Sequence, residues 1–141
     1  MAKVSTNPER FTATRAAHAA EIAEDYVEAI ADLVEKSGEA RVTHLATMLG
    51  VSHVTVTRTL TRLERDGLVV TEPYRPVKLT PRGRALATAT KKRHEIVVAF
   101  LLAAGVSAKQ AEVDAEGIEH HCSKPTLKAL ESLTATLTDR S

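Results

Sequence analysis

Cysteine is nearly absent from this sequence of 141 residues, because Cys122 is the single one. One thiol excludes an intrachain disulfide and any zinc or iron–sulfur centre built from several cysteines. A metal ion bound by this chain would therefore be held by oxygen and nitrogen atoms. Cys122 itself is expected to pack as a small apolar side chain.

Long apolar runs are also lacking. No stretch approaches the roughly 20 apolar residues of a membrane-spanning helix, and the first residues contain no apolar signal core. We therefore expect a soluble, cytoplasmic protein with no membrane partner. The hydrophobic content of 43% is enough for one or two small domains.

Net charge is close to zero, at +1, but the charges are unevenly distributed. Residues 41–100 carry eleven Lys or Arg against four Asp or Glu, whereas the remaining residues carry eight against fourteen. A basic middle between acidic ends indicates one surface for phosphate and another for cations.

The basic middle contains the pattern of a helix-turn-helix. A short amphipathic helix over 43–49 is followed by Gly50, which permits a tight turn, and by a second helix over 53–66. The outer face of the second helix carries small hydroxyls and two arginines, which suits a helix that enters a DNA groove. The candidate DNA contacts are Ser52, His53, Thr55, Thr57, Arg58 and Arg62. An ordinary solvated helix face is the alternative interpretation.

A wing is predicted directly after this unit. The segments 68–71 and 77–79 are typical of short strands, and the turn between them contains Arg75. We expect Arg75 at the tip to contact a phosphate group or the neighbouring minor groove.

Helices are expected on both sides of the winged unit. Apolar spacing predicts a helix over 18–36, whereas residues 1–16 show no periodicity and are expected to form a mobile tail. Thr80-Pro81 predicts the start of a helix that runs to about Ala104, and its second half is apolar on almost all sides. Such a helix would cover both its own core and a second subunit, so we expect a homodimer.

Two more helices are expected at the end of the chain. One is predicted over 107–122, and the other begins after Ser123. The inward stripe of the last helix is expected to comprise Leu127, Leu130, Leu133 and Leu137. The predicted fold is therefore mainly α, with a tail over 1–16, a winged helix-turn-helix domain with a two-stranded wing over 17–88, and a helical domain over 89–141.

The sequence AEGIEHH, residues 115–121, is the strongest candidate for a binding site. In a helix, Glu116, Glu119 and His120 would share one face, because they stand at positions i, i+3 and i+4. Two carboxylates and an imidazole on one patch form either a solvated face or a metal site. Asp25 and Glu28, one turn apart on the first helix, are a second acidic pair of the same ambiguous kind.

Several of these motifs together resemble the manganese transport regulator (MntR) branch of the diphtheria-toxin-repressor (DtxR) family. The likeness extends from about Glu21 to Leu137. Its motifs are DYVEAI (25–30), VTHLATMLGVSHVTVTRTL (42–60), LTPRG (79–83), RHEIV (93–97), AFLLAAGVS (99–107) and DAEGIEHHCS (114–123). The resemblance implies a homodimeric transcription regulator that binds divalent metal between its DNA-binding domain and its helical metal-binding and dimerisation domain. We expect no SH3-like domain after the likeness ends.

The resemblance also implies a ligand set. The positions that match the family's metal ligands are Asp25, Glu28, His94, Glu116, Glu119 and His120. The iron-responsive branch has methionine at the position of Asp25 and cysteine at that of Glu116, whereas hard carboxylates favour Mn²⁺. Six ligands with four carboxylates could hold two ions per subunit, although other divalent transition metals could bind the same groups. His121 has no counterpart among the ligands.

The implied function is repression of manganese uptake genes through a palindromic double-stranded DNA operator when Mn²⁺ is abundant. One alternative is a metal-independent winged-helix regulator that senses a small molecule or an oxidant, for example through Cys122. Another is a dinuclear metalloenzyme, since paired carboxylates and histidines can activate water. Six ligands would leave few open positions, and no HExxH motif occurs, so we expect no enzymatic activity.

Overall fold

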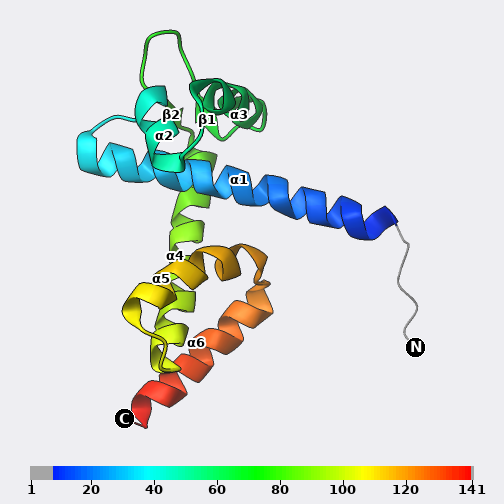
Figure 1. The fold of residues 1–141 in the computed structure, drawn as a ribbon, viewed down its shortest axis with the longest axis vertical. Coiled ribbons are helices and arrows are strands. Elements are labelled where there is room, and N and C mark those ends of the chain that lie inside the picture. Colours follow the sequence, from blue (N-terminus) through cyan, green and yellow to red (C-terminus); the bar gives the residue numbers. More distant parts are fainter. Residues whose placement is uncertain (1–7, 141) are drawn as a thin grey trace.

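The computed structural model describes residues 8–140, which form helices and one two-stranded sheet. The elements are α1 (Pro8–Ser37), α2 (Val42–Leu49), α3 (His53–Arg65), β1 (Val69–Val70), β2 (Lys78–Leu79), α4 (Pro81–Ala103), α5 (Ala108–Ile118), the 3₁₀ turn η1 (Glu119–His121) and α6 (Lys124–Asp139). Figure 1 shows an upper body of α1 to β2 and a lower body of α5 to α6, with α4 running through both. The mainly α fold with a winged helix-turn-helix is confirmed.

Helix α1 is longer than the sequence predicted. We expected a helix over 18–36 after a tail over 1–16, but α1 begins at Pro8; residues 1–7 lie outside the described part of the chain. Proline suits a first helical position, and the alanine-rich segment after it favours a helix without an apolar stripe. The prediction missed this segment because it searched for apolar periodicity. Figure 1 shows the first part of α1 projecting beyond both bodies.

Helices α2 and α3 form the predicted helix-turn-helix. Gly50 ends α2 at a φ of 68°, a left-handed conformation that glycine adopts without strain. Ser52 then begins α3, because its Oγ accepts a hydrogen bond of 3.1 Å from the N–H of Thr55. The inner faces of both helices pack against α1 in one core, which includes Val27, Ile30, Leu45, Val56, Leu60 and Leu63.

The wing has shorter strands than expected. β1 and β2 are antiparallel, with Val69 opposite Leu79 and Val70 opposite Lys78. Val77 lies outside the ladder because it forms an isolated bridge with Ala40, which attaches the base of the wing to the segment after α1. The tip is fully exposed: Tyr74 has a relative accessibility of 99%.

Helix α4 connects the two bodies. Thr80 caps it, since its Oγ1 accepts a hydrogen bond of 3.0 Å from the N–H of Gly83. Gly83 is required by the close approach of the wing, because a Cβ atom there would lie 2.1 Å from the carbonyl oxygen of Leu68. The far end of α4 packs against α5 and α6 around a second, smaller core of Val97, Ala115 and Leu127.

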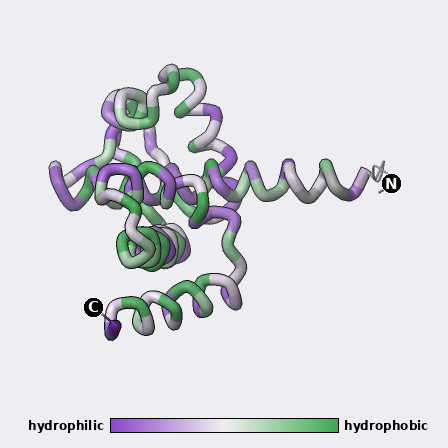
Figure 2. The backbone as a smooth tube through the Cα atoms, turned by 60° about the horizontal axis from the view of Figure 1, so that its bottom comes forward, coloured by the Kyte–Doolittle hydropathy of each residue, from purple (hydrophilic) through white to green (hydrophobic). Residues whose placement is uncertain are grey.

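Several large apolar side chains of the lower body face solvent in the single chain, namely Leu102, Val113, Ile118 and Leu133. The expectation that Leu133 lies on the inward stripe of the last helix is wrong, because it is 47% exposed. Helix α6 packs mainly against α4, so one flank of its apolar face is left uncovered. Figure 2 shows hydrophobic positions recurring along α6. Within residues 8–140, the structure contains no helix with the length and hydropathy of a membrane span.

Candidate metal centre and nucleic-acid interface

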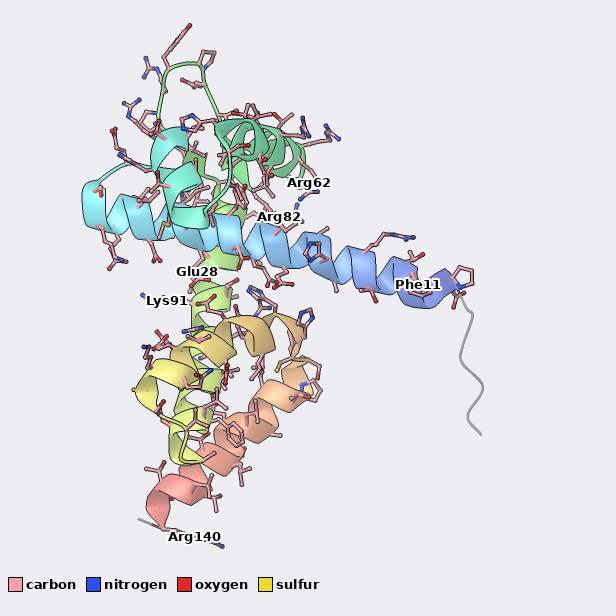
Figure 3. All side chains as sticks on the ribbon, viewed as in Figure 1. Phe11, Glu28, Arg62, Arg82, Lys91 and Arg140 are labelled. Atoms are coloured by element: carbon pink, nitrogen blue, oxygen red, sulfur yellow. The ribbon has the colours of Figure 1, made fainter. Side chains whose placement is uncertain are left out.

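Ionisable side chains from three places in the chain meet where α1 crosses the lower body. Helix α1 contributes carboxylates from the upper body, α4 contributes Arg93 and His94, and α5 with η1 contributes the acidic and imidazole groups of residues 112–121. Glu28, labelled in Figure 3, lies at this junction beside α4. Glu24 and His120, which are 96 positions apart in the sequence, are therefore in direct contact.

His120 is the centre of the inner part of the junction. Its side chain is 2% exposed, and its Nε2 lies 3.0 Å from Asp25 Oδ1 and 3.1 Å from Glu119 Oε1. Its Nδ1 lies 2.6 Å from the Oε2 atom of Glu24. Arg93 closes the group, with Nη2 at 2.7 Å from the same Glu24 oxygen and Nε at 3.3 Å from Glu119 Oε2.

His94 is the centre of the outer part. Its Nδ1 lies 3.3 Å from Glu116 Oε1, and its Nε2 lies 2.7 Å from Glu112 Oε2. Glu28 is half-buried nearby, close enough to Glu116 for that charge to change its pKa. The six predicted metal ligands are thus all located at this junction, although their role as ligands stays a prediction.

The pKa values reflect crowded carboxylates. Burial and the charges of Glu116 and Glu119 raise the pKa of Glu28 to about 7. Burial also raises the pKa of Asp25, against the partial opposing effect of His120. The pKa of His120 is raised as well, because the hydrogen bond with Glu24 and the charge of Glu119 outweigh the lowering effect of burial.

The donor atoms suit a hard divalent cation. Glu116, Glu119 and His120 form one group whose potential ligand atoms lie within 4.8 Å of one another, and Glu21, Asp25 and His120 form another. Within residues 8–140, the buried atoms Glu119 Oε1 and His94 Nδ1 have no hydrogen-bond partner. Buried polar atoms without a partner are rare, and a cation bound beside each of these atoms would satisfy it.

The local structure differs from the prediction around the AEGIEHH motif. We expected one helix over 107–122, but α5 ends at Ile118 and residues 119–121 form a 3₁₀ turn. Such a turn is a common end of an α-helix and changes the angular spacing of its side chains. Glu119 and His120 nevertheless both reach the junction. Cys122 packs against the second core, as expected.

Sequence reasoning missed four polar residues of the junction: Glu21, Glu24, Arg93 and Glu112. Two of them had a detectable signal, since Glu21 precedes Asp25 by four positions, and Glu112 precedes Glu116 by four. Glu24 and Arg93 had no such signal, because nothing in the sequence distinguishes a buried charge from a solvated one. His121, expected outside the ligand set, lies 3.5 Å from Glu21.

A separate surface carries the predicted DNA contacts. His53, Thr57, Arg58 and Arg62 are exposed on the outer face of α3. Ser52 and Thr55 are partly occupied by the cap of α3, where their hydroxyls lie 3.0 Å apart. Arg75 is exposed in the wing, and its Nε lies 3.4 Å from Glu72 Oε2.

Comparisons with known proteins cover both bodies. Residues 18–77 match the model of the iron dependent repressor N-terminal DNA binding domain, and residues 80–140 match that of the iron dependent repressor metal binding and dimerisation domain. The transcriptional regulator MntR of Escherichia coli O6:H1 is 46% identical over 134 residues, which cover 95% of this chain and 86% of that protein. The HTH-type transcriptional regulator MntR of Geobacillus kaustophilus is 43% identical over 100 residues, 71% of each.

A solved structure of similar fold is a manganese-dependent transcriptional repressor in complex with manganese. It has a TM-score of 0.72 and 28% sequence identity to this chain, of which it covers 80%. The present chain spans about half of that longer protein, at 52%.

Proposed function

This chain belongs to the iron-dependent repressor family, in the manganese transport regulator branch, and from this premise we propose that it represses manganese uptake genes in response to Mn²⁺. Family membership makes it a metal-responsive DNA-binding transcriptional repressor and not an enzyme. The proposal further specifies the metal, the number of ions, the ligands and the kind of operator.

The proposal rests on one observation: the clustered side chains come from both bodies of the molecule. Asp25 and Glu28 belong to the DNA-binding body, whereas His94, Glu116, Glu119 and His120 belong to α4 and the lower body. A cation held by both groups would link the recognition helix to the rest of the molecule. Four carboxylates and two imidazoles contain no soft sulfur ligand, which supports Mn²⁺ among the divalent transition metals.

Two ions per subunit are supported by how the donors are distributed. His120, Asp25 and Glu119 converge at one end of the junction, and His94 with Glu116 converges at the other, beside Glu28. Carboxylates between the two ends could be shared by both ions. Co²⁺, Fe²⁺ or Cd²⁺ could occupy the same donors, so abundance in the cell would also decide which metal acts.

The mechanism follows from the charges at the junction. A bound divalent cation would supply the positive charge that lets ionised carboxylates of α1 and α5 stay close together. Asp25 and Glu28 would then hold α1, and with it α2 and α3, in one orientation relative to the lower body. Allosteric coupling of this kind is typically about 1–3 kcal/mol.

The second half of the mechanism requires two copies of the chain. The exposed apolar residues Leu102, Val113, Ile118 and Leu133 support a homodimer formed through the lower bodies. Two-fold symmetry would place two recognition helices on a palindromic operator at a spacing set by the dimer. The metal-independent alternative is not supported by the relatives, which include a manganese-dependent repressor.

The test is a DNA-binding titration with Mn²⁺, followed by fluorescence anisotropy. The labelled duplex is selected from a random pool with Mn²⁺-loaded wild-type protein, because no operator sequence is assumed. We expect wild type and a Glu35→Gln control to bind the duplex only with Mn²⁺, whereas Glu116→Gln and His94→Ala require much more Mn²⁺. Equal binding by all four proteins in excess chelator would overturn the proposal.

A further inference from the structure

Two charged residues at the inner part of the junction are not among the six predicted ligands, although they contact them directly. Glu24 lies on α1, where it is 9% exposed, and Arg93 lies on α4 with a side chain that is 24% exposed. They form an ion pair of 2.7 Å across the boundary between the two bodies. Charged groups are rarely buried without a specific arrangement of partners, so this pair requires an explanation.

Glu24 controls which nitrogen of His120 is available. Its Oε2 atom lies 2.6 Å from His120 Nδ1, and a carboxylate oxygen can only accept, so Nδ1 carries the proton in this contact. In a neutral imidazole the lone pair then resides on Nε2. That atom faces Asp25 Oδ1 and Glu119 Oε1, at 3.0 and 3.1 Å.

Arg93 controls which oxygen of Glu119 is available. Its Nε donates to Glu119 Oε2 at 3.3 Å, while its Nη2 lies 2.7 Å from Glu24. The other oxygen, Oε1, is left buried and without a hydrogen-bond partner among the described residues. The fork of one guanidinium therefore contacts one oxygen of each of two carboxylates and leaves Glu119 Oε1 directed at His120 Nε2.

We propose that Glu24 and Arg93 are positioning residues that orient His120 and Glu119 toward one bound cation. This inference rests on the proposed metal-binding function and deepens it. Glu24 sets the tautomer of His120, and Arg93 sets the rotation of the Glu119 carboxylate.

The experiment varies the hydrogen-bond acceptor at position 24 and the guanidinium group at position 93. In Glu24→Leu, His120 loses its acceptor; in Glu24→Gln, the amide oxygen can still accept from Nδ1. Arg93→Lys keeps the positive charge, but one ammonium group cannot reproduce the two-carboxylate fork of arginine. Glu35→Leu is the matched control, since it makes the same change of residue type at an exposed position of α1.

Three quantities are measured for each protein: the affinity for Mn²⁺, the visible absorption spectrum of bound Co²⁺, and the melting temperature in EDTA. We expect Glu24→Leu to bind Mn²⁺ about 10- to 100-fold more weakly and to show a changed Co²⁺ spectrum. Glu24→Gln should recover most of the affinity and the wild-type spectrum. Arg93→Lys should also lose affinity, because its charge alone does not orient Glu119.

Other outcomes would overturn the inference. A purely structural role predicts a lower melting temperature with unchanged Mn²⁺ affinity and Co²⁺ spectrum in Glu24→Leu and Arg93→Lys. If Glu24→Leu does not fold, Arg93→Lys with wild-type affinity and spectrum still contradicts the proposal. Failure of the wild type to bind either cation would instead contradict the proposed function, so the two failures are distinguishable.

Discussion

The inner part of the junction (Glu24, Asp25, Arg93, Glu119 and His120) contains an arginine, whereas the outer part (Glu28, His94, Glu112 and Glu116) contains no arginine or lysine. In the inner part, Arg93 lies between two carboxylates at 2.7 and 3.3 Å. In the outer part, no lysine or arginine within residues 8–140 pairs with Glu28 or Glu116, and the pKa of Glu28 rises to about 7.

This difference assigns separate tasks to the two parts. The inner part can hold α1 against α4 in the absence of metal, because the guanidinium of Arg93 lies between Glu24 of α1 and Glu119. The outer part keeps unbalanced negative charge until a cation arrives. We therefore expect changes in the inner part to affect the metal-free protein, and changes in the outer part to affect mainly its response to Mn²⁺.

The largest expected effect is that of Arg93→Met on the stability of the metal-free protein. Removal of Arg93 from this largely buried group leaves Glu24 and Glu119 without the guanidinium that pairs with both of them, which should lower the free energy of unfolding by about 3 kcal/mol. Urea unfolding in EDTA measures this value. Arg84→Met, which alters an exposed arginine of the same helix, should have little effect. Equal losses of unfolding free energy in both variants would show that Arg93 has no special role in the metal-free protein.

The next effect concerns the outer part. At a Mn²⁺ concentration about 100 times its dissociation constant, binding should stabilise the wild type by about 2.7 kcal/mol. Glu116→Gln should lose most of this stabilisation at the same Mn²⁺ concentration, yet remain at least as stable as wild type in EDTA, because one of the repelling charges is gone. Thermal unfolding with and without Mn²⁺ measures both quantities. If Glu116→Gln lowered the stability equally with and without Mn²⁺, the proposed division between the inner and outer parts would be contradicted.

The pH dependence should have opposite signs for stability and for metal binding. The pKa of Glu28 is about 7 in the folded protein against an ordinary value of 4.5, so the folded state binds this proton more tightly. Metal-free stability should therefore fall as the pH rises from 4.5 to 7, by about 1 kcal/mol once the partial exposure of Glu28 is allowed for. The raised pKa values of His94 and His120 act in the same direction above about pH 6.5.

Mn²⁺ affinity should instead weaken as the pH falls through the raised pKa values of His94 and His120, which lie above 6.5, because both imidazoles must lose a proton to bind. Chemical unfolding in EDTA between pH 4.5 and 8 measures the first trend, and Mn²⁺ titrations over pH 5 to 8 measure the second. Glu28→Gln should flatten the slope of stability with pH, and Glu35→Gln should not. An identical slope in all three proteins would show that the charges of the outer part do not repel as inferred.

The smallest expected effect is that of Glu112→Gln. Glu112 is exposed, and its contact of 2.7 Å orients His94 through the nitrogen that does not face Glu116. Glutamine can still accept this hydrogen bond, so the Mn²⁺ affinity should fall by about tenfold at most. Isothermal titration with Mn²⁺ measures the change. A loss as large as that of Glu116→Gln would place Glu112 among the ligands themselves.

Sequence patterns were sufficient for most of the fold. Gly50, Ser52 and Thr80-Pro81 marked helix ends correctly because capping and left-handed turns depend on local chemistry. The start of α1 at Pro8 was missed, since that segment has no apolar stripe, and the exposure of Leu133 depends on neighbours that a sequence does not show. The boundary placed between residues 88 and 89 falls within the continuous helix α4 and stays a prediction.

The site was less predictable from residue types than the fold was. The resemblance named six residues that the structure brings to one junction, but residue types alone left AEGIEHH ambiguous between a solvated face and a metal site. Glu24 and Arg93 could not be identified, because a buried charge is recognised only by the partners that surround it. The DNA contacts on α3 and at Arg75 stay predictions that exposure supports.

The central claim is that metal binding and DNA binding are coupled through the junction. Coupling is reciprocal in thermodynamics, so a saturating amount of the selected duplex should raise the Mn²⁺ affinity by the same factor by which Mn²⁺ raises the DNA affinity, about 5- to 150-fold. Mn²⁺ titrations of the wild-type dimer with and without the duplex measure this factor. Equal Mn²⁺ affinities in the two titrations would contradict the account.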